Sequence, residues 1–117
     1  MKLYLAGPMS GLPDFNFPAF HRWAETLRSN GHKVFSPAEH DEEKWGAQNF
    51  KSPTGSNKDV KGTWTLREAL AADCEFICKH AQGVAMMPGW ERSFGCRAEH
   101  ALAVALGLEI IYLSDAP

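Results

Sequence analysis

The chain has 117 residues, a formal charge of −2 and 44% apolar residues, which suit a single globular domain with one core. Acidic and basic residues are interspersed, so a broad cationic surface for a nucleic-acid polymer is not expected. The apolar run near the amino end is too short for a signal peptide or a membrane span. These features predict a cytoplasmic protein without a membrane partner.

Short apolar runs alternate with segments of helical spacing in the first third of the chain. A buried strand is predicted over residues 2–6. The next segment predicts a helix with Asn16 as its N-cap and a stop at Asn30 and Gly31. A second strand is expected over residues 33–36, so this part of the chain predicts a right-handed strand, helix, strand unit.

Residues 38–62 are polar and rich in Lys, Ser, Asn and Gly. A long connection of this kind is unusual unless it has a function or moves, so we predict a flexible lid, with one helical turn around residues 42–45. After it, helical spacing returns over residues 63–79, and an apolar run over 83–87 predicts the third strand.

A last helix is predicted from Ser93, its N-cap, to Ala105, and a last strand over residues 109–113. The alternation predicts a small doubly wound α/β sandwich, flavodoxin- or Rossmann-like, with a mainly parallel sheet of four to five strands. Ligands of such sheets bind beyond the carboxyl ends of the strands. We therefore expect the site at the turns after the first and third strands.

Two carboxylates occupy positions where apolar residues are expected. Glu99 shares a row of the last helix with Gly95, Leu102 and Leu106, and Asp73 continues the apolar stripe of the preceding helix. A carboxylate that faces the core is costly unless it is paired or used. Two of them suit glycosidic cleavage, in which one attacks the anomeric carbon while another group manages the proton on the leaving base. Alternatively, each simply binds a nearby arginine, lysine or backbone N–H.

The turns after the strands also offer binding groups. Gly7 would let a ligand approach the backbone closely, and Ser93 and Gly95 open a helix whose unpaired N–H groups and dipole suit a 5'-phosphate. The other interpretation of Ser93 is an ordinary N-cap. Arg92 and Arg97 either add contacts to a phosphate or only solvate the helix.

Aromatic rings near these turns, those of Phe15, Phe17 and Trp90, either stack on a base or belong to the core. The chain has neither a P-loop nor a dinucleotide-binding fingerprint. Cys74 and Cys78 lie four residues apart without a Cys-x-x-Cys pair, and the odd cysteine count favours free thiols. We therefore expect no metal and no cofactor.

Three segments resemble the nucleoside 2-deoxyribosyltransferase superfamily: Leu3-Tyr4-Leu5-Ala6-Gly7-Pro8, Asp73 before the third strand, and Gly95-Cys96-Arg97-Ala98-Glu99. The resemblance spans nearly the whole chain. That superfamily includes base-exchanging deoxyribosyltransferases, deoxynucleoside 5'-monophosphate N-glycosidases and many short bacterial and phage proteins, which are similar to this chain in length.

The resemblance implies that Glu99 is a nucleophile that forms a deoxyribosyl ester, and that Asp73 orients the sugar or protonates the base. It implies a small-molecule deoxynucleoside or deoxynucleotide as partner. It also implies a homodimer or higher homo-oligomer, because relatives complete each pocket with residues of a neighbouring subunit. The residues expected to bind substrate are Tyr4, Gly7, Pro8, Met9, Ser10, Phe15, Trp90, Ser93, Gly95 and Arg97.

The predicted activity is cleavage or transfer of the N-glycosidic bond of a 2'-deoxynucleoside or its 5'-monophosphate. Water as acceptor makes the protein a hydrolase and a second base makes it a transferase, and nothing in the sequence decides between them. The alternative is a non-catalytic module that binds or senses a nucleotide on the same fold. A third hypothesis, a structural or interaction protein, needs neither carboxylate.

Overall fold

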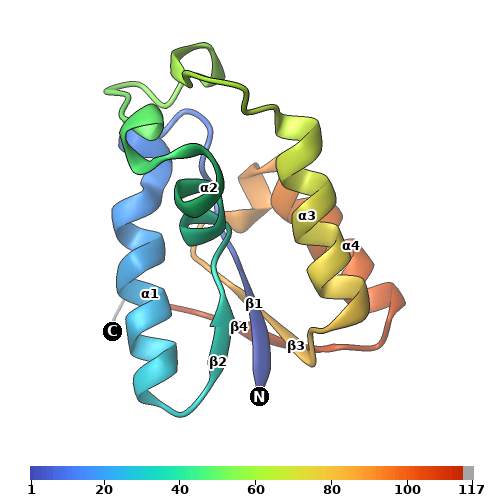
Figure 1. Ribbon diagram of the computed structural model, residues 1–117. Coiled ribbons are helices and arrows are strands. Elements are labelled where there is room, and N and C mark those ends of the chain that lie inside the picture. Colours follow the sequence, from blue (N-terminus) through green and yellow to red (C-terminus); the bar gives the residue numbers. More distant parts are fainter. Residues whose placement is uncertain (115–117) are drawn as a thin grey trace.

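The computed structural model describes residues 1–114, in which four parallel strands form one sheet (Figure 1). The strands are β1 (Lys2–Ala6), β2 (Lys33–Phe35), β3 (Gly83–Met86) and β4 (Glu109–Tyr112). Their order, β2-β1-β3-β4, confirms the predicted α/β class and is compatible with a small doubly wound, Rossmann-like fold. The chain reverses its winding between β1 and β3, which is where such sheets bind ligands.

Four α-helices and four short 3-10 turns connect the strands in the described part of the chain. They are α1 (Phe17–Ser29), α2 (Pro37–Trp45), α3 (Leu66–Lys79), α4 (Phe94–Ala105), η1 (Pro13–Asn16), η2 (Ala47–Phe50), η3 (Asn57–Asp59) and η4 (Trp90–Arg92). The predicted strands and three predicted helices are confirmed, with ends that differ by up to three residues. None of the described helices combines the length and the apolar character that a membrane span requires.

Alternate residues of β1 build the core on the two faces of the sheet. Leu3 and Leu5 pack with the buried face of α1, whereas Tyr4 and Ala6 pack with buried residues of α3 and α4. Figure 1 shows α1 on one side of the sheet and α3 and α4 on the other. Residues 3–6 are all buried, as expected for a central parallel strand.

The turn between β1 and α1 has an unusual backbone. Asp14, Phe15 and Asn16 have φ angles of 50°, 56° and 62°, in the left-handed region that non-glycine residues seldom adopt. Asn16 precedes α1 as predicted, but its side chain does not cap the helix. Its Nδ2 donates instead to the carbonyl oxygen of Pro8 at 3.1 Å, which ties the start of α1 to the turn after β1. The turn after β1 is thereby held in a strained shape.

The polar segment 38–62 is more regular than the sequence suggests. We expected one helical turn, whereas α2 extends over nine residues and two 3-10 turns follow it. Pro37 stands at the first helical position, where its fixed φ favours a helix and its missing N–H costs nothing. Ala38 then buries its methyl group in the core. The mobility of this segment stays a prediction.

Backbone hydrogen bonds join this segment to the turn after β1. The Gly11 N–H donates to the Gly55 carbonyl at 2.8 Å, and the Asp14 N–H donates to the Ser52 carbonyl at 2.7 Å. Gly55 has a φ of +70°, and a Cβ there would lie 2.1 Å from the carbonyl oxygen of Leu12. Only glycine allows the two backbones to meet this closely.

Candidate active site

A cleft of about 830 Å³ opens beyond the carboxyl ends of β1 and β3, where the sequence predicts a ligand site. Its walls come from the turns after these strands, from α2, α3 and α4, and from residues 50–64. This volume lies within the roughly 300–1,000 Å³ that is common for small-molecule sites.

Glu99 enters the cleft from α4 and is held by a residue of the sheet. The Tyr4 hydroxyl donates a hydrogen bond of 2.6 Å to Oε2 of Glu99, and the two residues are only 1% and 5% exposed. Burial raises the pKa of Glu99 to about 7, although the Tyr4 hydrogen bond lowers it. Burial and the charge of Glu99 raise the pKa of Tyr4 well above its ordinary value, so Tyr4 remains a donor.

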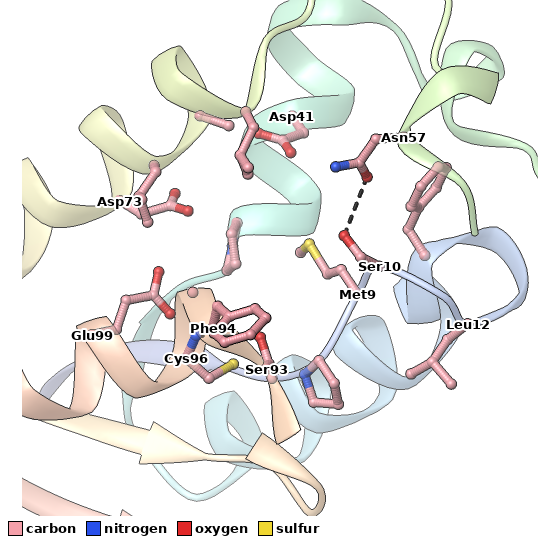
Figure 2. A pocket seen from close by; sticks show the side chains of 18 of the residues that line it. Met9, Ser10, Leu12, Asp41, Asn57, Asp73, Ser93, Phe94, Cys96 and Glu99 are labelled. Carbon is pink, nitrogen blue, oxygen red and sulfur yellow. Dashed lines mark hydrogen bonds between the residues drawn. The ribbon is translucent and has the colours of Figure 1, made fainter. Parts of the chain in front are cut away.

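Asp73 enters the same part of the cleft from α3, next to Glu99 (Figure 2). It is 8% exposed, and its Oδ1 has no hydrogen-bond partner among the described residues. Burial, followed by the charges of Glu99 and Asp41, raises the pKa of Asp73 to about 8, and the Tyr4 hydroxyl opposes this shift. Near pH 7, Asp73 therefore carries a proton that it can donate.

Asp41 is a third buried carboxylate in the cleft, and the sequence did not single it out. It lies on α2, is 4% exposed, and accepts a hydrogen bond of 3.4 Å from Nε1 of Trp64. Burial raises the pKa of Asp41 to about 6, against the opposing effects of Trp64 and His40. One signal was present: Ala38, Asp41 and Trp45 have the spacing of one helical face.

The opposite end of the cleft is apolar and aromatic. Phe15 and Phe17 lie at the start of α1, and Phe50 contacts both rings at centroid distances of 6.4 and 5.2 Å. Trp64 packs edge-on against Phe50 at 6.3 Å. Met9 and Leu12 line the same cleft from the turn after β1. The rings of Phe15, Phe17 and Phe50 are only 3–4% exposed and belong to the core, so the accessible apolar surface here comes mainly from Met9, Leu12 and Trp64.

The amino end of α4 forms another wall of the cleft. The Ser93 hydroxyl accepts a hydrogen bond from the Cys96 N–H at 3.3 Å, which confirms Ser93 as the N-cap. Gly95 and Arg92 also line the cleft here. Phe94 lies at the same place and is 85% exposed. An anion at this end would meet a helix amino terminus and a guanidinium group. The binding of a 5'-phosphate by Ser93 stays a prediction.

The structure brings most of the predicted site residues together. The cleft is lined by Tyr4, Gly7, Pro8, Met9, Ser10, Phe15, Asp73, Ser93, Gly95 and Glu99. Two predicted residues do not line it. Trp90 stacks on His100 at a centroid distance of 4.3 Å, and the Arg97 guanidinium lies over the Phe94 ring at 5.8 Å. Trp90 lies on η4, before α4, and Arg97 is exposed on α4.

Within residues 1–114, no three or more His, Cys, Asp or Glu side chains are grouped so that they could hold a metal ion. The described cysteines are free thiols, of which Cys96 is buried, Cys74 half-buried and Cys78 exposed. Burial raises the pKa of Cys96 to about 12, so it is a poor nucleophile or metal ligand. The titratable groups that remain for chemistry in the cleft are its carboxyl groups and Tyr4.

The part of the chain that forms the cleft matches a known protein family. A model of the family described as a domain of unknown function, DUF4406, matches residues 1–112. The chain belongs to the DUF4406 family. The match runs from β1 to the end of β4, so the DUF4406 domain contains the whole sheet and every residue of the cleft. No curated protein matches the chain.

Proposed function

We propose that this DUF4406 domain cleaves the N-glycosidic bond of a 2'-deoxynucleoside or its 5'-monophosphate, or transfers the deoxyribosyl group to a second base. The observation that carries this proposal is the placement of two buried carboxyl groups, Glu99 and Asp73, in the same part of one cleft. Glu99, held by Tyr4, is ionised above pH 7, and Asp73 stays protonated up to about pH 8. A nucleophile and a proton donor are the two groups that this reaction needs.

In the proposed first step, Glu99 attacks C1' of the deoxyribose. Because the Tyr4 hydroxyl occupies Oε2, we assign the attack to Oε1. The C1'–N bond breaks, its electron pair moves to the base, and Asp73 delivers its proton to the base. The products are a free base, an ester between Glu99 and the sugar, and an ionised Asp73.

In the second step, the ester is opened by an acceptor. Asp73 now acts as a base, removes a proton from water or from an incoming base, and regains its protonated state. The acceptor bonds to C1', the ester bond breaks, and its electron pair returns to Glu99. Two displacements at one carbon retain the configuration of the sugar.

A 5'-phosphate would lie at the amino end of α4. Ser93, Gly95 and Arg92 line the cleft there, and the helix dipole favours a negative charge. The resemblance to the nucleoside 2-deoxyribosyltransferase superfamily at β1, Asp73 and Glu99 supports the roles of Glu99 and Asp73 proposed above. We further propose a homodimer or higher homo-oligomer, since the exposed Phe94 and Leu66 stand at the cleft and would be covered by a second subunit. A cytoplasmic location is proposed from the sequence alone.

Release of free base tests the proposal directly. The panel contains deoxynucleosides, their 5'-monophosphates and the ribose counterparts, each with and without an acceptor base. Glu99→Gln keeps the shape of the side chain but removes the nucleophile, and Glu91→Gln, at an exposed position near α4, is the matched control. We expect release by the natural protein and by Glu91→Gln, and none by Glu99→Gln.

The other outcomes separate the alternatives. If no panel member releases base while nucleotides still bind tightly, the domain is a binding or sensing module. If neither binding nor release is found, and Glu99 and Asp73 can both be replaced without effect on any partner, the domain is a structural or interaction protein.

A further inference from the structure

We propose that Asp41 and Asp73 together select a base that carries an amino group next to a ring nitrogen, as adenine and cytosine do, over bases with an oxygen at that position. The proposal rests on the function proposed above and names the substrate class of the same cleft. Its starting point is the placement of two buried carboxyl groups on adjacent walls.

The two side chains come from different helices but enter one space. Asp41 lies on α2 and Asp73 on α3, two helices that contact one another, and both side chains line the cleft. Figure 2 shows Asp41 between Asp73 on one side and Asn57 on the other. In the same view Glu99 lies below Asp73, next to it. A base whose sugar is placed at Glu99 would therefore meet Asp73 and Asp41 with its edge.

Both carboxyl groups have an oxygen that lacks a partner. The Asp41 side chain is only 5% exposed, and its Oδ1 accepts no hydrogen bond from a described residue, although Nδ1 of His40 lies 3.6 Å away, within ion-pair distance when His40 is protonated. The Asp73 Oδ1 is likewise buried and without a partner among the described residues. Buried polar atoms are normally hydrogen-bonded, so two carboxyl groups that line one cleft and each keep an oxygen without a hydrogen bond suit a ligand with polar groups.

The two groups offer opposite hydrogen-bonding characters near neutral pH. Asp73 is protonated and donates, whereas most Asp41 is ionised at pH 7.5 and accepts only. Adenine presents an acceptor nitrogen beside an amino donor, and cytosine has an amino donor at the corresponding place. Guanine and thymine place an acceptor oxygen there, which would face an ionised carboxylate without a proton between them. The pair therefore matches amino bases and rejects oxo bases.

Trp64 gives Asp41 a fixed position beside the aromatic wall. Its indole N–H donates to Oδ2 of Asp41, and its ring packs edge-on against Phe50. The other polar side chains nearby, Ser10 and Asn57, hydrogen-bond to each other at 3.1 Å. A planar base against the wall would thus find Asp41 and Asp73 as its principal polar contacts, and these decide which edge fits.

Binding to the Glu99→Gln variant tests the inference without turnover. The probes are two matched pairs of deoxynucleoside 5'-monophosphates: the adenine and hypoxanthine compounds, and the cytosine and uracil compounds. Each pair differs in an amino or an oxo group, and titration calorimetry at pH 7.5 gives the ratio of dissociation constants. We expect the amino member to bind about tenfold more tightly or better in at least one pair. Equal binding, tighter binding of the oxo members, or no binding of any probe would overturn the inference.

Asp41→Asn in the same background tests the residue itself. An amide presents an N–H donor to the oxo group, so the preference should fall toward one or reverse. The matched control is Glu43→Gln, at an exposed position of α2, which should keep the preference. An unchanged preference in a folded Asp41→Asn protein would overturn the role of Asp41. Tighter binding of the amino members without base release would contradict the proposed activity and leave this inference standing. Base release with equal binding of amino and oxo members would support the activity and overturn this inference.

Discussion

The Tyr4 hydroxyl and the Glu99 carboxylate, 95 residues apart in the chain, are joined by a hydrogen bond of 2.6 Å. Tyr4 is set in the central strand, and its ring packs against Phe35 and Phe76 at centroid distances of 5.7 and 6.5 Å. The sheet and this aromatic stack thus fix the position of the proposed nucleophile.

Tyr4→Phe is expected to weaken catalysis without removing the nucleophile. Loss of one buried hydrogen bond to an anionic group should lower kcat about 10- to 100-fold and change KM little. Because the Tyr4 hydrogen bond lowers the pKa of Glu99, the acidic limb of the pH profile should move to higher pH. Steady-state kinetics across pH measure both effects. An unmoved acidic limb would show that Tyr4 does not act through Glu99.

The rate of base release should have a bell-shaped dependence on pH. Glu99 must be ionised to attack and has a pKa raised to about 7, so the rate rises through that pH. Asp73 must be protonated to assist departure and has a pKa raised to about 8, so the rate falls above it. The two neighbouring groups titrate as a pair, so the measured values belong to both. A rate that still rises at pH 10 would remove Asp73 from the role of proton donor.

Folding stability should decrease as the pH rises from about 4 to about 8. In this range the folded protein keeps protons on Asp73 and Glu99, whose pKa values are raised, while the unfolded chain has lost them. Asp73→Asn removes one ionisable group, so it should raise Tm by about 4 °C or more at pH 8.5 and by less at pH 5. Thermal unfolding followed by circular dichroism at the two pH values measures this. An equal change at both would contradict a raised pKa.

Gly55→Ala is expected to disturb the contact between the turn after β1 and the segment that contains Gly55. The new Cβ would meet the Leu12 carbonyl at 2.1 Å with φ at +70°, and the loss of unfolding free energy should exceed about 1–3 kcal/mol. The matched control is Gly31→Ala, which has φ at +93° but no atom within 4 Å, so it carries the backbone strain alone. Denaturant unfolding compares the two variants. Equal losses would mean that the close approach at Gly55 is unimportant.

Much of this protein is determined by local patterns in its sequence. Apolar runs and helical spacing predicted the strands and three helices, and Ser93 predicted the start of α4, because these features depend on residues a few positions apart. The same spacing indicated that Glu99 and Asp73 face inward, and both are buried. α2 was underestimated, because its polar composition hides a start that Pro37 and the buried Ala38 stabilise.

Only the tertiary structure decided which inward-facing groups meet. Helical spacing tells which face a side chain occupies but not what lies opposite, so Asp41 and Trp64 stayed hidden and Trp90 was assigned to the cleft although it stacks on His100. The burial of a side chain depends on all the elements that surround it, so it cannot be read from a short stretch of sequence. The raised pKa values of the three carboxyl groups follow from this burial.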